Sequence, residues 1–131
     1  MDERLRSIVS DLRERGSSEA AGWLMEHYPV GSANSGEALT IIAHLSWKKA
    51  DQVRLAEHYL SSMPFAHAQP YEVFASFMSM SGLIGVMRKY IPSGERKQLF
   101  EYHAVRVLTR AAKTSKDREA VQKFLEEVKA R

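Results

Sequence analysis

Hydrophobic residues recur every three or four positions along almost the whole chain. At the N-terminus they form one stripe, made of Leu5, Ile8, Val9 and Leu12. Near the C-terminus the same spacing gives Val121, Phe124, Leu125 and Val128. This spacing places apolar residues on one side of a helix, and no segment shows the alternation of a half-buried strand. The pattern predicts an all-α fold, and the length of 131 residues predicts one domain, 1–131.

Turn-forming residues divide the first half of this pattern into four predicted helices. The first ends at Gly16, and the second ends at Tyr28 before a proline. Asn34 and Glu37 have the spacing of a capping box at the start of the third helix. A break at 46–51 precedes the fourth helix, which ends by 61–64.

The second half is predicted to hold three more helices, which makes seven. The fifth spans 71–91, with Pro70 at its start and a predicted kink near Gly82 and Gly85. A Pro-Ser-Gly turn at 92–94 separates it from the sixth helix, from 95 to about 113. Thr114 or Ser115 is expected to cap the seventh.

Three tyrosines, Tyr28, Tyr59 and Tyr90, follow one another at a spacing of 31, each near the end of a predicted helix. A period of this length is typical of helix-pair repeats that stack into a solenoid. The alternative is that helix ends favour an aromatic residue before a breaker. The expected architecture is therefore a set of antiparallel helical hairpins, arranged either as a TPR-like α-solenoid or as a bundle.

The first two of these tyrosines belong to a repeated Glu-His-Tyr motif, at 26–28 and 57–59. Histidine beside a carboxylate and a phenol is a combination that catalytic and metal sites use. On a helical wheel, however, His27 lies on the apolar side of its helix whereas His58 points outward. Equivalent ligands or bases would face the same environment, so the motif is interpreted as structural. We expect core-facing tyrosines, outward glutamates, His27 at the edge of the core and His58 in solvent.

Composition excludes several chemistries. The chain contains no cysteine, which excludes disulfides, thiolate zinc sites and cysteine nucleophiles. It contains no His-x-x-x-His or Glu-x-x-His pair for a metal on one helix face, and no Gly-rich phosphate loop. The remaining histidines, His44, His67 and His103, are scattered. The sequence therefore predicts a protein that is not an enzyme, with no catalytic residue, metal site or cofactor.

The chain also lacks the features of a membrane or secreted protein. Its first 16 residues are charged and amphipathic, with no apolar core of a signal peptide. The longest uncharged run, 73–87, has 15 residues, whereas a membrane span needs about 20. A cytoplasmic protein without a membrane span is expected.

Charge is distributed unevenly along the chain. Residues 1–87 carry 7 basic and 10 acidic side chains, a net of −3, and residues 88–131 carry 12 basic and 6 acidic, a net of +6. In the sixth predicted helix five basic residues fall within an arc of about 100° on a helical wheel. They are Arg96, His103, Arg106, Arg110 and Lys113. This basic stripe is suited to nucleic acid, to an acidic protein partner or simply to solvent, although it lacks interleaved aromatic residues and no helix-turn-helix signature is evident.

The fifth predicted helix combines large apolar residues with small ones. The segment PYEVFASFMSMSGLIGVM (70–87) interleaves phenylalanine and methionine with serine, alanine and glycine. Small residues allow close helix packing, which favours a central core helix, and methionines make adaptable apolar surfaces. The alternative is that part of this surface lines a groove for an amphipathic partner helix.

Three segments together resemble the small TPR-like co-chaperones of type III secretion, including their plant-pathogen relatives. They are EAAGWL (19–24), SGEALTIIAHLSWKKAD (35–51) and PYEVFASFMSMSGLIGVM (70–87), and they cover about half of the chain. The matching positions are Ala20, Trp23, Leu24, Glu37, Ala38, Leu45, Ser46, Asp51, Pro70, Tyr71, Phe77 and Gly82. Two departures are the Ala50-Asp51 pair, where such repeats have Gly-Asp, and the long, basic C-terminal helices.

The resemblance implies a cytosolic protein without catalytic residues that binds other proteins. Its partners would be the amphipathic helix of a secreted needle or pilus subunit, a small helical co-chaperone or a regulator of secretion genes. The candidate groove contacts are Tyr71, Phe74, Phe77, Met78 and Met80. Three other classes stay open: a nucleic-acid-binding protein that uses the basic stripe, an enzyme, and a toxin-neutralising immunity protein.

Overall fold

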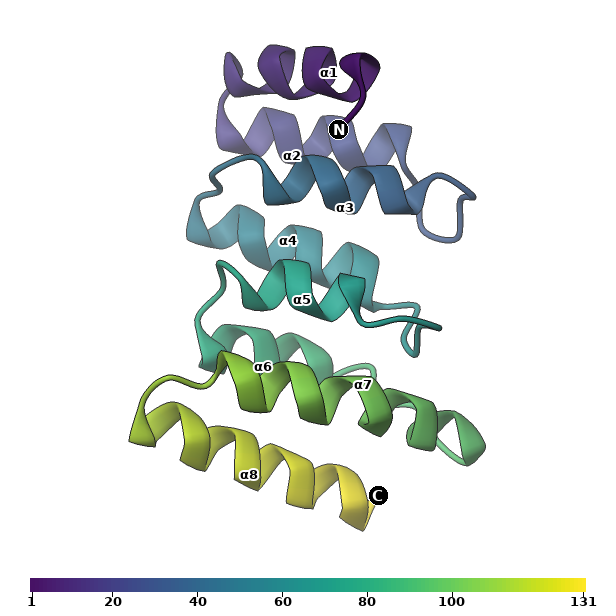
Figure 1. Cartoon of the computed structure of the whole chain (residues 1–131), viewed down its shortest axis with the longest axis vertical. Helices are drawn as coiled ribbons and strands as arrows, with labels where there is room; N and C mark the ends of the chain where they lie inside the picture. The colour runs from purple at the N-terminus through teal and green to yellow at the C-terminus, as the bar shows by residue number, and fades with distance from the viewer.

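The computed structural model describes all 131 residues and contains helices only. The eight helices are α1 (Glu3–Arg13), α2 (Ser17–His27), α3 (Ser35–Ala43), α4 (Lys49–Leu60), α5 (Gln69–Ala75), α6 (Met80–Arg88), α7 (Glu95–Ala111) and α8 (Ser115–Ala130). Successive helices form antiparallel pairs that stack along the long axis of the molecule (Figure 1). The predicted all-α class with antiparallel hairpins is confirmed.

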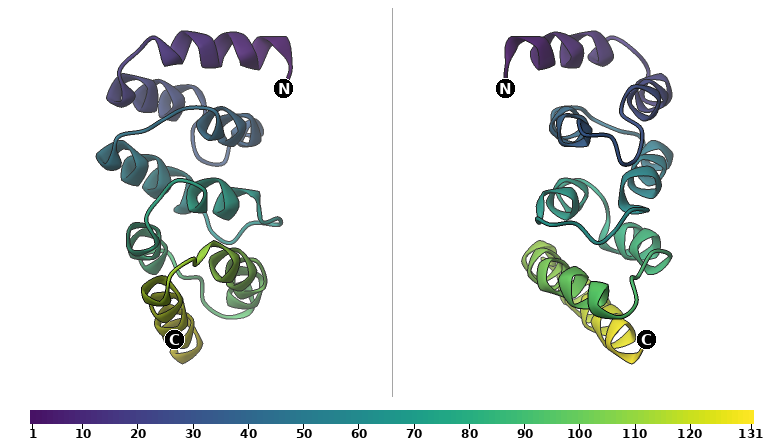
Figure 2. Two further views of the ribbon diagram at one scale, coloured as in Figure 1. Left: turned by 60° about the vertical axis from the view of Figure 1, so that its left-hand side comes forward. Right: turned by 90° about the vertical axis from the view of Figure 1, so that its right-hand side faces the viewer.

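The stacked helices form two layers, and the right-hand view of Figure 2 separates α3 and α5 from α2, α4 and α6. Helices α1, α3, α5 and α7 pack in sequence in the odd-numbered layer, and α2, α4, α6 and α8 do so in the even-numbered layer. Each helix therefore contacts mainly the preceding and following members of its own layer. This is the solenoid arrangement rather than a bundle around one central axis.

The 31-residue spacing corresponds to one step of this stack. Leu24, Leu55 and Val86 occupy equivalent buried positions in α2, α4 and α6. The Tyr59 hydroxyl donates to the carbonyl oxygen of Tyr28 at 3.0 Å, which joins α4 to the end of α2. One step further along, the Tyr90 hydroxyl donates to Glu57 Oε2 at 2.6 Å. Tyr59 and Tyr90 thus link consecutive helices of the even-numbered layer, whereas the Tyr28 hydroxyl donates to Glu37 of α3.

The predicted fifth helix is wrong as a single element, because it is divided into α5 and α6 by a break at 76–79. The Met78 N–H donates to the carbonyl of Phe74 at 3.0 Å as α5 ends, and the Ser79 hydroxyl then accepts from the N–H of Gly82 at 3.1 Å. Ser79 is therefore the N-cap of a new helix. The predicted kink near Gly82 and Gly85 is misplaced, since both glycines lie within α6.

Gly82 has a packing role in this cap. A Cβ atom at Gly82 would lie 2.9 Å from Ser79 Oγ, so a side chain there would collide with the capping hydroxyl.

Of the two helix caps that the sequence predicted, one is present and one is absent. Thr114 caps α8 as predicted, accepting from Asp117 N at 3.0 Å. The predicted capping box of α3 is absent, because Asn34 makes no side-chain cap bond and Glu37 instead pairs with Arg4 and accepts from the Tyr28 hydroxyl.

The two histidines of the repeated motif lie opposite to their predicted environments. His27 is exposed and stacks on Trp23 with ring centroids 4.0 Å apart. His58 is half-buried, with Nε2 3.4 Å from the carbonyl oxygen of Tyr28. The helical wheel assumed one buried side for each helix, whereas α4 also packs against α2 along its flank. The buried tyrosines and an exposed Glu26 agree with the prediction, but Glu57 is half-buried.

Candidate functional site: the exposed face of α7

The aromatic and methionine residues proposed as groove contacts do not form an open groove. Tyr71 and Phe74 are fully buried, and Met78 and Met80 retain only 9% and 7% of their surface. Phe77 is half-buried, and its ring lies against Phe74 with centroids 5.7 Å apart. The seven-residue helix α5 is enclosed by α3, α4, α6 and α7, so its large side chains fill the core. The expectation of an accessible groove at these residues is therefore wrong for this structure.

The predicted basic stripe, in contrast, lies at the surface of α7. Arg96, Arg106, Arg110 and Lys113 are exposed, and His103 is half-buried. None of the five has a carboxylate oxygen within 4.0 Å, so their charges are not neutralised by ion pairs. The structure keeps them on one helix, whose last residue is Ala111, with Lys113 just beyond it.

Two large hydrophobic residues interrupt this stripe. Leu99 and Tyr102 are 40% and 55% exposed, and they are two of only four large hydrophobic residues exposed in the chain. The Tyr102 ring lies under the guanidinium of Arg106, with the Cζ atom 4.5 Å from the ring centroid. The expectation that the stripe lacks an interleaved aromatic residue is therefore wrong.

These residues follow one another at helical spacing. Successive steps of three, four, four and three residues give a surface that we call the α7 face, made of Leu99, Tyr102, Arg106, Arg110 and Lys113. Such spacing places the first four on one side of α7, and Lys113 follows two residues after the helix ends. The sequence alone could have revealed this surface. Leu99 and Tyr102 lie on the same side of the helical wheel as the basic stripe, and not on the side of the core residues.

The N-terminal part of the α7 face is uncovered because α7 is longer than the helix beside it. α7 has 17 residues and its neighbour in the odd-numbered layer, α5, has seven. At 1.5 Å per residue the two helices are about 25 and 10 Å long. In Figure 1 the N-terminal part of α7 extends beyond the end of α5. The segment that carries Leu99 and Tyr102 therefore lacks a covering helix.

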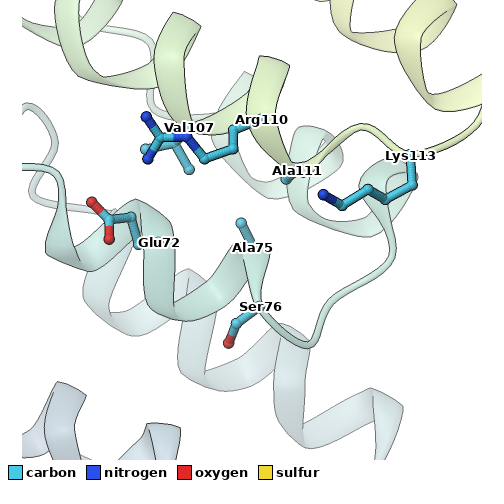
Figure 3. Close-up of a pocket in the computed structure, with 7 residues that line it drawn as sticks. All are labelled: Glu72, Ala75, Ser76, Val107, Arg110, Ala111 and Lys113. Carbon is cyan, nitrogen blue, oxygen red and sulfur yellow. The ribbon is translucent and has the colours of Figure 1, made fainter.

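Where α5 and α7 do lie side by side, they enclose an open pocket of about 450 Å³ (Figure 3). Val107, Ala111 and Ala75 give it apolar walls, and Arg110 and Lys113 supply positive charge from the α7 side. Glu72 extends from α5 on the opposite side, without a cation within ion-pair distance. The α7 face thus continues into a groove whose two sides carry opposite charges.

The carboxylates with shifted pKa values lie elsewhere and have structural partners. Hydrogen bonds from Lys89 and Tyr90 lower the pKa of Glu57, and the hydrogen bond from Arg88 lowers the pKa of Glu127. Both pairings connect neighbouring helices of the even-numbered layer, Glu57 on α4 with the end of α6 and Glu127 on α8 with α6. These ion pairs connect helices within that layer, whereas the cations of the α7 face pair with no carboxylate of the chain.

The structure shows no group of three His, Asp or Glu side chains placed to hold a metal ion. No helix combines the length and the hydrophobicity needed to cross a membrane. The sequence matches no family model, and no curated protein and no solved structure matches it. Functional inference therefore depends on the geometry of the α7 face.

Proposed function

We propose that this protein is a non-catalytic protein-binding module, and that the α7 face is its docking surface. The observation that carries the proposal is the combination of unpaired cations with exposed leucine and tyrosine on one helix. Tyrosine and arginine are enriched among the residues that dominate binding energy at protein interfaces. The stacked helix pairs supply a rigid support, because α7 packs on α5 and α8 through its opposite side.

The class of module that we propose is a cytosolic chaperone or adaptor of a type III secretion system. Its partner would be the helix of a secreted subunit, a small co-chaperone or a secretion regulator. The sequence resemblance supports this class, and stacked antiparallel helix pairs are the architecture that it implies. The docking surface differs from the one the resemblance implied, since the residues of the Pro-aromatic helix are buried and those of α7 are exposed.

Affinity purification from the native host tests this proposal. The full chain and its Tyr102→Ala/Arg106→Ala variant are used as bait, and the bound proteins are identified by mass spectrometry. We expect a small helical protein to be retained by the parent chain and lost from the variant. Retention of the same protein by both baits would remove the α7 face from the proposal, and recovery of nucleic acid alone would contradict the protein-binding function.

Nucleic-acid binding is a second candidate, favoured by one specific observation. Arg96, Arg106, Arg110 and Lys113 lack carboxylate partners and extend along one face with an exposed tyrosine. Phosphate contacts by these residues would make the logarithm of affinity fall linearly with the logarithm of salt concentration. The test is a titration of DNA and RNA duplexes and single strands at several salt concentrations. Arg106→Glu and Arg110→Glu should abolish any binding that uses this face.

A further inference from the structure

We infer that the partner presents an acidic amphipathic helix, which lies along the α7 face and extends into the groove between α5 and α7. This inference rests on the proposed protein-binding function and specifies the chemistry of the partner. The α7 face shows three properties that together select such a helix: its charge, its apolar residues and the carboxylate on the far side of the groove.

The charges on the α7 face have the spacing of a helical partner. Arg106 and Arg110 lie one turn apart, and Lys113 follows three residues later. Carboxylates at i and i+4 of a partner helix recur at the same interval as Arg106 and Arg110, so a helix aligned with α7 pairs with both cations, and Lys113 adds positive charge just beyond the end of α7. From Leu99 to Arg110 the face extends about 17 Å, which corresponds to roughly three helical turns.

The apolar residues of the α7 face provide a contact surface that a partner with negative charge alone would not cover. Leu99 and Tyr102 lie one turn apart at the uncovered end of α7, and Val107 and Ala111 continue as apolar positions in the groove. A helix with apolar residues every three or four positions covers Leu99 and Tyr102 while its acidic residues reach the cations. Burial of this apolar surface favours association and is a contribution that a simple polyanion cannot make.

Glu72 favours a peptide over nucleic acid as the occupant. Its carboxylate lies on the α5 side of the groove, across from Arg110 and Lys113, and has no cation of its own chain within 4.0 Å. A continuous phosphate backbone entering the groove would be repelled by it. A partner helix that is acidic on one side avoids this repulsion by directing its carboxylates towards α7.

The test uses the full chain and fluorescence polarisation with three probes. The first is a designed peptide of about 18 residues, long enough for the helical turns that the face requires, with leucine at every third or fourth position and glutamate between them. The second has the same composition in a permuted order without an apolar stripe. The third is single-stranded DNA of the same net charge. We expect the amphipathic peptide alone to bind at moderate salt.

Two matched pairs of charge-reversal variants separate a local site from a general effect of net charge. Arg110→Glu should weaken binding about tenfold, whereas Arg6→Glu, an equal change on the distant helix α1, should leave it within about twofold. Glu72→Lys should strengthen binding about threefold, whereas Glu14→Lys at the other end of the molecule should not. All four positions are exposed, and thermal melts monitored by circular dichroism establish that each variant is folded.

Each other outcome overturns the inference. Equal binding of the permuted peptide would exclude an amphipathic helix, and tighter binding of DNA would assign the face to nucleic acid. Equal effects of Arg6→Glu and Arg110→Glu would show that the peptide is attracted by the net charge of the protein and not by a local site. Failure of the peptide, with continued Tyr102-dependent capture of a native partner, would reject the acidic helix alone. Loss of both would reject the protein-binding function as well.

Discussion

Two buried tyrosines predict opposite responses to the same substitution. The hydroxyl of Tyr59 donates to the carbonyl of Tyr28 at 3.0 Å, and the carbonyl of Leu24 lies 3.3 Å away. The hydroxyl of Tyr71 is fully buried and makes no hydrogen bond of good geometry, although the backbone N–H of Phe65 lies close enough to oppose part of the rise in its pKa. Tyr59→Phe therefore removes a buried bond, whereas Tyr71→Phe removes an unpaired polar group.

The expected changes follow from the energetics of buried polar groups. Loss of the Tyr59 hydrogen bond should lower the free energy of unfolding by about 1–1.5 kcal/mol. An unpaired buried hydroxyl costs about 1–3 kcal/mol, so Tyr71→Phe should raise the free energy of unfolding by about 1 kcal/mol or more. With an unfolding entropy near 2 cal/mol/K per residue, each kcal/mol shifts the melting temperature of a chain of this size by about 3–4 °C.

Urea and thermal unfolding at neutral pH, followed by circular dichroism, measure both changes. Alkaline titration gives an independent readout. Burial raises the pKa of Tyr71 to about 12 and also raises the pKa of Tyr59 above its usual value. Because the folded pKa values are raised, the two tyrosines add no pH dependence below the unfolded pKa of about 10, and the free energy of unfolding falls as the pH rises from there through the folded pKa values. Each phenylalanine variant should therefore lose less stability than the parent chain between neutral and alkaline pH.

A measured decrease in stability for Tyr71→Phe at neutral pH would refute the reasoning, because the hydroxyl would then have a partner. An unchanged stability for Tyr59→Phe would likewise show that the link between α4 and the end of α2 contributes nothing. Tyr90→Phe is a useful comparison, because its hydroxyl bonds to Glu57 in a half-buried position and should cost less than Tyr59→Phe.

Four further substitutions test other parts of the fold. Gly85→Ala should raise the free energy of unfolding by about 0.5–1 kcal/mol, because a Cβ atom there meets nothing within 4 Å. Gly82→Ala should lower the free energy of unfolding by about 1 kcal/mol, because its Cβ atom displaces the Ser79 cap. Chemical denaturation compares the two variants. Asp51→Ala should lower it by about 2–3 kcal/mol, since the buried carboxylate accepts from Ser17 at 2.7 Å and from Arg54 at 3.0 Å. Hydrogen bonds from Lys89 and Tyr90 lower the pKa of Glu57. The stability that this carboxylate adds is therefore present above its unfolded pKa and is lost as the pH falls through its lower folded pKa. In acid denaturation, Glu57→Gln should lose less stability than the parent chain between these two pKa values.

The hydrophobic pattern predicted most of the fold, because most helices begin and end at local signals. Thr114 caps α8 through its own side chain, and Pro70 lies in the first turn of α5. The break between α5 and α6 was missed because 76–79 contains neither proline nor glycine and the apolar stripe continues across it. It depends on the neighbouring helices, which bury Met78 and Met80 on either side of the exposed Ser79.

The candidate site was predicted only in part, for a related reason. A helical wheel identifies charged residues on the outer side, and it correctly placed Arg106 and Arg110 at the surface. It assigned Leu99 and Tyr102 no separate role, although both share the helical phase of Arg106 and Arg110, because apolar residues were tested only against the phase of the core. The positions of His27 and His58 failed in the same way, since the contact of His58 with Tyr28 is made by a helix 30 residues earlier in the chain.

The two layers predict a separation of stability from binding, which Tyr102→Ala tests directly. Tyr102 is 55% exposed, and its ring contacts only Arg106 and His103 among charged and aromatic neighbours. Its removal should change the free energy of unfolding by no more than about 0.5 kcal/mol, the usual range for surface substitutions. The same change should weaken binding of the acidic amphipathic peptide about tenfold or more, because aromatic residues at the centre of an interface carry a large share of its energy. Tyr59→Phe should show the reverse, with lower stability and unchanged peptide affinity. If Tyr102→Ala instead destabilised the fold as much as Tyr59→Phe does, Tyr102 would be needed for the packing of the helices. The exposed face of α7 could then not be assigned to a partner.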